Sequence, residues 1–148
     1  MDEPTLLDLL GGPEAIHCLE EVFYDKALND PVLSQVFPRR QPTHVDHLTA
    51  FTIESFGGED RFTRELGFNY LIDVHSGLRI TEEQRQRFVE VYAAALDEVA
   101  LSDDPRVREA VMAHIEFGSQ VAMQNSHATS EAELHPLREV PRWKVDGS

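Results

Sequence analysis

The chain has little cysteine, little basic charge and no long apolar run. Cys18 is the single cysteine among 148 residues, which excludes an intramolecular disulfide. Acidic residues outnumber basic ones by 27 to 13, and the net charge of −14 disfavours nucleic acid and anionic membrane surfaces as partners. No stretch approaches the roughly 18 consecutive apolar residues that a membrane-spanning helix needs. We therefore expect no nucleic acid and no membrane among the partners.

The composition otherwise indicates a single globular domain. Hydrophobic residues make up 41% of the chain, enough for one core but with no sign of a second. The first residues lack the basic and apolar blocks of a secretory signal peptide, which favours a cytoplasmic location. We expect a folded domain over residues 1–126 and a tail over residues 127–148.

The apolar periodicity is helical throughout, with no strand pattern, and it predicts an all-α fold. In the second helix the apolar residues share one face, whereas Glu20 and its acidic neighbours are expected on the solvent face. Thr81 and Gln84 match a capping box and predict the start of a long helix. We expect a loop over 59–67, a short apolar turn over 32–37, and helices over about 4–10, 13–29, 42–56, 68–75, 81–100 and 104–125.

The tail is small, polar and acidic up to Glu133 and then contains two prolines and the only tryptophan. This composition favours a mobile segment. The alternative is that Leu137, Val140 and Trp143 dock on the helical body.

His75 lies in the last turn of an apolar helix, before a new helix begins at Thr81. A histidine there commonly meets exposed backbone carbonyls, but a neutral imidazole can also hold a haem iron if an apolar slot, polar donors and cations surround it. Tyr24 and His44 are candidate donors, and Arg79, His47 and Arg39 are candidate cations. The candidate slot residues are Phe37, Leu48, Phe51, Phe56, Leu71, Ile80 and Phe88.

Other interpretations fit the periodicity nearly as well. The slot residues could form an ordinary helical core, and the chain could be an acidic helical interaction module. Glu14 and His17 have the Glu-x-x-His spacing of di-iron bundles, and with Asp73 they suggest a non-haem metal protein, although no second copy of the motif is present.

The order of these residues resembles the truncated haemoglobins, most closely their group II, over about residues 4 to 126. The landmarks are Gly11-Gly12, the Phe23-Tyr24 pair, Phe37, His44 with Leu48 and Phe51, Gly57-Gly58, and His75 followed by Leu78-Arg79-Ile80. The resemblance implies a two-over-two sandwich of helices with a very short first helix. It makes His75 the proximal iron ligand, Tyr24 the residue over the bound ligand, Phe37 an aromatic wedge beside the porphyrin, and His44 the variable distal residue.

The resemblance also implies haem b as cofactor and a diatomic gas (O2, CO or NO) as ligand. It allows detoxification of nitric oxide or peroxide, an electron-donating reductase and a homodimer, and it leaves open whether the protein is an enzyme. One departure stands out, because Phe88 occupies the place of the tryptophan that is usual in group II. A phenyl ring cannot donate a hydrogen bond, so the distal network is expected to rest on Tyr24, His44 and water.

Overall fold

The computed structural model describes residues 4–37, 43–137 and 139–145, and every long element in these ranges is a helix. The expectation of an all-α fold is thus confirmed. The elements are α1 (Leu6–Leu10), α2 (Pro13–Leu28), η1 (Leu33–Gln35), α3 (His44–Ser55), α4 (Arg61–Glu65), α5 (Phe68–His75), α6 (Glu82–Val99), α7 (Pro105–His127) and η2 (Glu131–Glu133).

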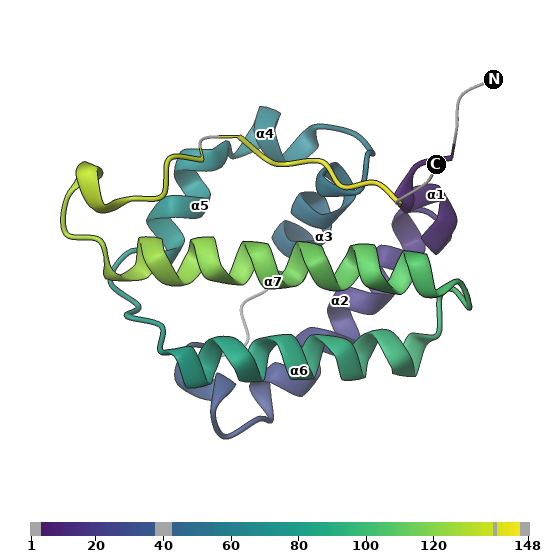
Figure 1. Cartoon of the computed structure of the whole chain (residues 1–148), viewed down its shortest axis with the longest axis horizontal. Coiled ribbons are helices and arrows are strands. Elements are labelled where there is room, and N and C mark those ends of the chain that lie inside the picture. The colour runs from purple at the N-terminus through teal and green to yellow at the C-terminus, as the bar shows by residue number, and fades with distance from the viewer. Residues whose placement is uncertain (1–3, 38–42, 138, 146–148) are drawn as a thin grey trace.

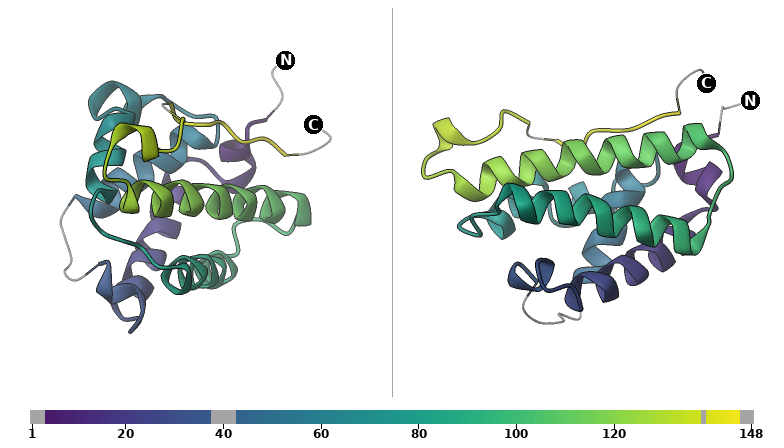
Figure 2. Two further views of the ribbon diagram at one scale, coloured as in Figure 1. Left: turned by 60° about the vertical axis from the view of Figure 1, so that its left-hand side comes forward. Right: turned by 60° about the horizontal axis from the view of Figure 1, so that its bottom comes forward.

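Two pairs of helices build the body of the molecule. α2 packs against both α3 and α6, and α6 packs against α7, so that the α2/α3 pair faces the α6/α7 pair (Figure 1). The two rotated views in Figure 2 show the same pairing, with α5 beside the C-terminal half of α7. This is the two-over-two sandwich that the resemblance implies, and α1 is its very short first helix.

The helix starts follow the sequence signals. At α6 the backbone N–H of Gln84 donates to Thr81 Oγ1 at 3.1 Å, and the N–H of Thr81 donates back to Gln84 Oε1 at 2.9 Å. This is the expected capping box. At α7 the carboxylate of Asp104 accepts from the N–H of Arg106 at 2.9 Å, and Pro105 takes the first helical position.

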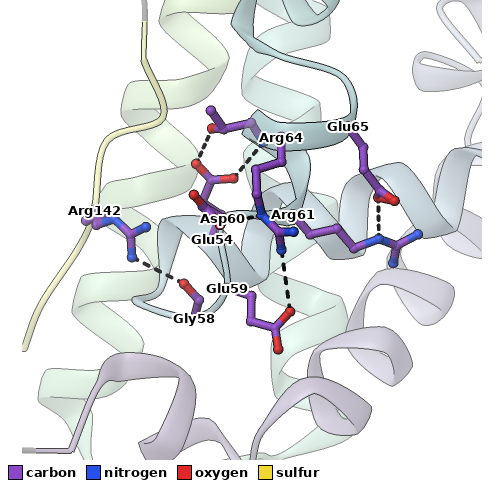
Figure 3. Close-up of polar contacts among 9 residues, drawn as sticks. Glu54, Gly58, Glu59, Asp60, Arg61, Arg64, Glu65 and Arg142 are labelled. Atoms are coloured by element: carbon purple, nitrogen blue, oxygen red, sulfur yellow. Dashed lines mark hydrogen bonds and ion pairs between the residues drawn. The ribbon is translucent and has the colours of Figure 1, made fainter.

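The expected loop over 59–67 contains a helix instead, so that prediction is wrong. In α4, Arg61 and Glu65 pair at 2.5 Å, and Arg64 pairs with Asp60 at 2.7 Å, as Figure 3 shows. Phe62 is buried on the inner side of this turn. Ion pairs at i, i+4 and the burial of one ring thus stabilise the single helical turn of α4. The mixture of charged residues and glycine in this segment had predicted a loop.

The glycine pair after α3 permits a close approach between α1 and α3. A Cβ added at Gly58 would meet Leu7 and Ile53 at 2.6 Å, and Gly57 adopts φ +97°. The N–H of Leu7 donates to the carbonyl of Phe56 at 3.0 Å across this contact. The short first helix is therefore fixed to the end of α3.

The described part of the tail docks on the helical body rather than standing free. It runs back past α5, α4 and α3 toward α1 (Figure 1), and Val140 and Val145 are buried along it. The N–H of Trp143 donates to the carbonyl of Ser55 at 2.7 Å, and Arg142 donates to the carbonyl of Gly58 at 3.3 Å (Figure 3). The structure thus follows the docking alternative, because the apolar residues near the end of the tail bury against the body.

Among the described residues, no helix is both long enough and apolar enough to cross a membrane.

Candidate functional site

A cavity of about 440 Å³ lies between the two helix pairs and α5. Its wall is mostly apolar and comes from α2, α3, α5, α6 and α7, with Phe37 contributed by the corner after η1. All but one of the residues predicted for the apolar slot line it: Phe37, Leu48, Phe51, Leu71, Ile80 and Phe88.

Phe56 is the exception, and its expected place in the slot needs correction. Its side chain is fully buried in the core beside His114, with ring centroids 5.0 Å apart, and it does not line the cavity. It lies five positions after Phe51, which corresponds to about 140° around a helix. The two rings therefore cannot both face the cavity.

His75 lines the cavity from the last turn of α5. Its Nδ1 lies 2.8 Å from the carbonyl oxygen of Leu71. A carbonyl can only accept, so Nδ1 carries the hydrogen and Nε2 carries the lone pair. Burial lowers the pKa of His75, against the smaller opposite effect of the Leu71 bond, and the ring is neutral near pH 7. These are the tautomer and the charge that a metal-binding imidazole requires.

Tyr24 of α2 and His44 of α3 form a hydrogen-bonded pair at one side of the cavity. The Tyr24 hydroxyl lies 2.6 Å from Nδ1 of His44, and the ring of Phe37 packs edge-on against both. His44 lines the cavity, whereas Tyr24 is fully buried behind it. Burial, with a smaller contribution from the charge of His47, lowers the pKa of His44 and favours its neutral form.

The cations are distributed differently from the expectation. His47 lines the cavity and bonds to the hydroxyl of Tyr70 at 3.0 Å, but Arg79 is exposed and lies outside the wall. Arg79 has φ +51°, and its N–H donates to the carbonyl of Ser126 at 3.3 Å. Arg39 lies outside the described residues.

Arg85 lines the cavity from α6 and was missed by the sequence reasoning. Its guanidinium donates to Glu82 at 2.7 Å and to the hydroxyl of Ser119 at 3.4 Å. Arg85 stands three residues before Phe88, and residues at that spacing share one helix face. This spacing could have identified it.

A polar group in the wall was also missed. Glu20 is 1% exposed, which corrects its expected place on the solvent face, and it lines the cavity with Thr52 and Tyr92. Its Oε1 accepts hydrogen bonds from Thr52 at 2.7 Å and from Tyr92 at 2.9 Å. Burial raises the pKa of Glu20 to about 7. Glu20 precedes Tyr24 by one turn, and that spacing was the available signal.

α7 and the tail complete the wall. His114 lines the cavity among the rings of Phe51, Phe56 and Trp143, and burial lowers its pKa to about 4. Leu137 and Pro141 of the tail are also lining residues. The tail is therefore part of the site.

The rival metal centre receives no support in the described ranges. No group of three histidine, cysteine, aspartate or glutamate side chains in these ranges could hold a metal ion. His17 pairs instead with Glu21 at 3.9 Å on the exposed face of α2.

Comparison with known proteins identifies the family. Residues 5–133 match the model of the bacterial-like globins. The chain belongs to the bacterial-like globin family. A curated relative, the group 1 truncated hemoglobin of Tetrahymena thermophila, is 28% identical over 102 residues, which are 68% of this chain and 81% of that protein.

Solved structures of truncated globins share the fold of this globin. The group II truncated hemoglobin of Bacillus anthracis matches with a TM-score of 0.76 and 24% identity, over 88% of this chain and 99% of that one. The hemoglobin of Chloroflexus aurantiacus matches with a TM-score of 0.72 and 25% identity, over 82% and 98% of the two chains. The expected truncated-globin fold is thus confirmed, with group II proteins among the structural matches.

Proposed function

We propose that this globin binds haem b through His75 and reversibly binds oxygen or another diatomic gas in the same cavity. The proposal rests on the position of His75 at the wall of a large apolar cavity, with its Nδ1 2.8 Å from the carbonyl oxygen of Leu71. This hydrogen bond, with the lowered pKa of His75, favours a neutral ring whose lone pair is on Nε2. Membership of a globin family implies haem binding, and the relatives named above are haemoglobins.

The residues present fit a porphyrin. Val74 and Leu78 line the cavity and are 44% and 42% exposed, so they are apolar groups that a macrocycle would cover. His47 and Arg85 are candidate partners for the propionates, because both line the wall and can carry positive charge. The Cys-x-x-Cys-His motif that attaches c-type haem needs two cysteines, and the chain has only Cys18, which disfavours c-type haem.

The Tyr24–His44 pair is the proposed hydrogen-bonding unit for the gas. Haem supplies the iron atom to which a diatomic molecule binds. A polar ligand such as oxygen gains from a nearby hydrogen-bond donor, whereas carbon monoxide gains less. Phe37 packs edge-on against both rings of the pair, which favours a fixed arrangement of the two donors. Oxygen is therefore expected to leave slowly.

Oxygen storage, sensing and the detoxification of nitric oxide or peroxide all require the same cavity. An electron-donating reductase, a homodimer and a cytoplasmic location stay predictions.

The visible absorption spectrum of the purified protein tests the haem proposal. Haem produces an intense Soret band, and conversion of the cofactor to its pyridine complex distinguishes haem b from other haems. A protein purified after haem supplementation without a Soret band would overturn the proposal and favour the helical interaction module.

A further inference from the structure

The buried wall of the cavity contains a carboxyl group with one oxygen that has no partner. Glu20, Thr52 and Tyr92 come from α2, α3 and α6, and they are 1%, 3% and 2% exposed. Both hydroxyls donate to the same oxygen, Oε1 of Glu20, at 2.7 and 2.9 Å. The other oxygen, Oε2, is buried without a hydrogen-bond partner.

This arrangement determines where the proton of Glu20 resides. Because Oε1 already accepts two hydrogen bonds, the protonated acid carries its hydrogen on Oε2. Burial favours that neutral acid, while the two hydroxyls oppose it by favouring the anion, and the balance places the pKa at about 7. Both forms of Glu20 are therefore populated near neutral pH.

An orphaned polar atom at a cavity wall indicates the place of a water molecule or a ligand atom. Burying an unpaired carboxyl oxygen is costly, and a water molecule accepting from Oε2–H would remove that cost. Glu20 lines the same cavity as His44 and stands one turn before Tyr24. A water molecule bound at Oε2 would link the carboxyl group of Glu20 to this cavity.

We propose that Glu20 is the proton donor of the cavity, holding a water molecule at Oε2 and passing a proton through it to a ligand with a protonatable oxygen or nitrogen atom. The Oε2–H bond breaks, the water takes that proton, and it releases one of its own to the ligand. Glu20 is left as a carboxylate that Thr52 and Tyr92 continue to stabilise. The inference rests on the proposed function, because the ligand is the one that the haem protein binds.

The groups that face Glu20 leave it suited to this role. Tyr92 stays protonated because burial raises its pKa well above the ordinary value, and Thr52 does not titrate. On α7, His114 lines the same cavity, and its pKa of about 4 keeps it neutral. His44 and His47 line the cavity from the first turn of α3, so a test must separate Glu20 from both.

Infrared difference spectroscopy of the purified haem protein makes that separation, since a protonated carboxyl absorbs where imidazole does not. The wild type is expected to show a carboxylic acid band that disappears with a midpoint near pH 7, and Glu20→Gln should abolish it. Glu54→Gln is the matched control, because the side chain of Glu54 in α3 is buried and accepts hydrogen bonds from Thr63 (Figure 3). Glu54 does not line the cavity. This variant should retain the band and its midpoint.

Two further measurements test whether the proton of Glu20 exchanges with water and whether the carboxyl group responds to the ligand. In D2O the band should shift promptly, and release of carbon monoxide by light should perturb it in wild type but produce no such signal in Glu20→Gln. A band that changes neither in D2O nor on ligand release would show that Glu20 exchanges no proton with water in the cavity and has only a structural role. That result would overturn the inference. Absence of the Soret band would instead overturn the proposed function, and the pH titration would still report on Glu20.

A second variant covers the case in which Glu20→Gln fails to fold. Thr52→Val removes one of the two bonds that favour the anion while keeping the carboxyl group. The midpoint of the band should then move to higher pH. An unchanged or lower midpoint would contradict the assignment of the band to Glu20.

Discussion

The hydroxyl of Tyr24 lies 2.6 Å from Nδ1 of His44, and this bond joins the second half of α2 to the first residue of α3. A phenol has one hydrogen to donate, so Tyr24 can give it to His44 or to a ligand but not to both. If His44 accepts, its own Nε2–H becomes the free donor of the pair. The two residues must therefore act together on any ligand in the cavity.

The first prediction concerns the rate at which oxygen dissociates from Tyr24→Phe, His44→Leu and the double variant. Losing a ligand hydrogen bond costs about 1.5–3 kcal/mol, so Tyr24→Phe should raise the oxygen off-rate roughly ten- to a hundred-fold. The double variant should be far less affected than the product of the single effects, because each substitution disrupts the same unit. Stopped-flow measurement provides the comparison, and strictly multiplicative effects would show that the residues act independently.

Two buried groups, Glu20 and His114, give opposite pH dependences of stability. The folded pKa of Glu20 is raised from 4.5 to about 7, so its contribution is present at low pH and is lost as pH rises to about 7. The folded pKa of His114 is lowered from 6.5 to about 4, so folding stability increases as pH rises from about 4 to 6.5. Each change corresponds to about 3 kcal/mol, and the two nearly cancel between pH 4.5 and 6.5.

The second prediction is that substituting either residue reveals the pH dependence of the unfolding free energy that the other contributes. The free energy of unfolding of Glu20→Gln should rise by about 3 kcal/mol between pH 4 and 6.5, whereas that of His114→Phe should fall by a similar amount between pH 4.5 and 7. Denaturant titrations at several pH values measure both. If the unfolding free energy of the wild type and of both variants depended on pH in the same way, neither Glu20 nor His114 would have a shifted pKa in the folded protein.

The third prediction concerns the two arginines. Arg85 lines the cavity, whereas the expected propionate partner Arg79 does not, so Arg85→Ala should accelerate haem loss more than Arg79→Ala. A partly solvated ion pair is worth about 1 kcal/mol or less, which limits the increase to roughly fivefold. Haem transfer to an acceptor globin measures these rates, and a larger effect of Arg79→Ala would restore the original expectation.

The docked tail supplies the fourth prediction. Trp143 is half-buried against His114 and Phe117, with ring centroids 5.9 and 5.8 Å away. Removing a fully buried tryptophan costs roughly 3–5 kcal/mol, so Trp143→Ala should cost about 2 kcal/mol of unfolding free energy. Haem loss should also increase, since Leu137 and Pro141 of the same segment line the cavity. Lys144→Ala, at an exposed neighbour, is the control, and equal stability of the two variants would contradict the docking.

The helices could be predicted because their signals are local. The capping box at Thr81 and Gln84, the Asp104-Pro105 start and the glycine pairs fix the boundaries within a few residues of where the structure has them. α4 escaped prediction because its turn depends on ion pairs among exposed residues and on the burial of Phe62, which no periodic pattern of five residues reveals.

The site was predictable where a residue type implies its environment. His75, Phe37 and Phe51 are such residues and line the cavity. Glu20, by contrast, looks like a solvent-facing residue on local pattern alone. Only the pairing of α2 with α3 and α6 brings Thr52 and Tyr92 to its carboxyl group. The backbone position of Arg79 and the docking of the tail could not be predicted for a similar reason, because both depend on long-range contacts, with Ser126 and with Ser55.

The haem content of His75→Ala is the most direct test of haem binding through His75. His17→Ala, which removes an exposed histidine of α2, serves as the matched control. We expect an intense Soret band and about one haem per chain for the wild type and for His17→Ala, and loss of stably bound haem in His75→Ala. A His75→Ala protein that retained full haem content and an unchanged spectrum would contradict haem binding through His75.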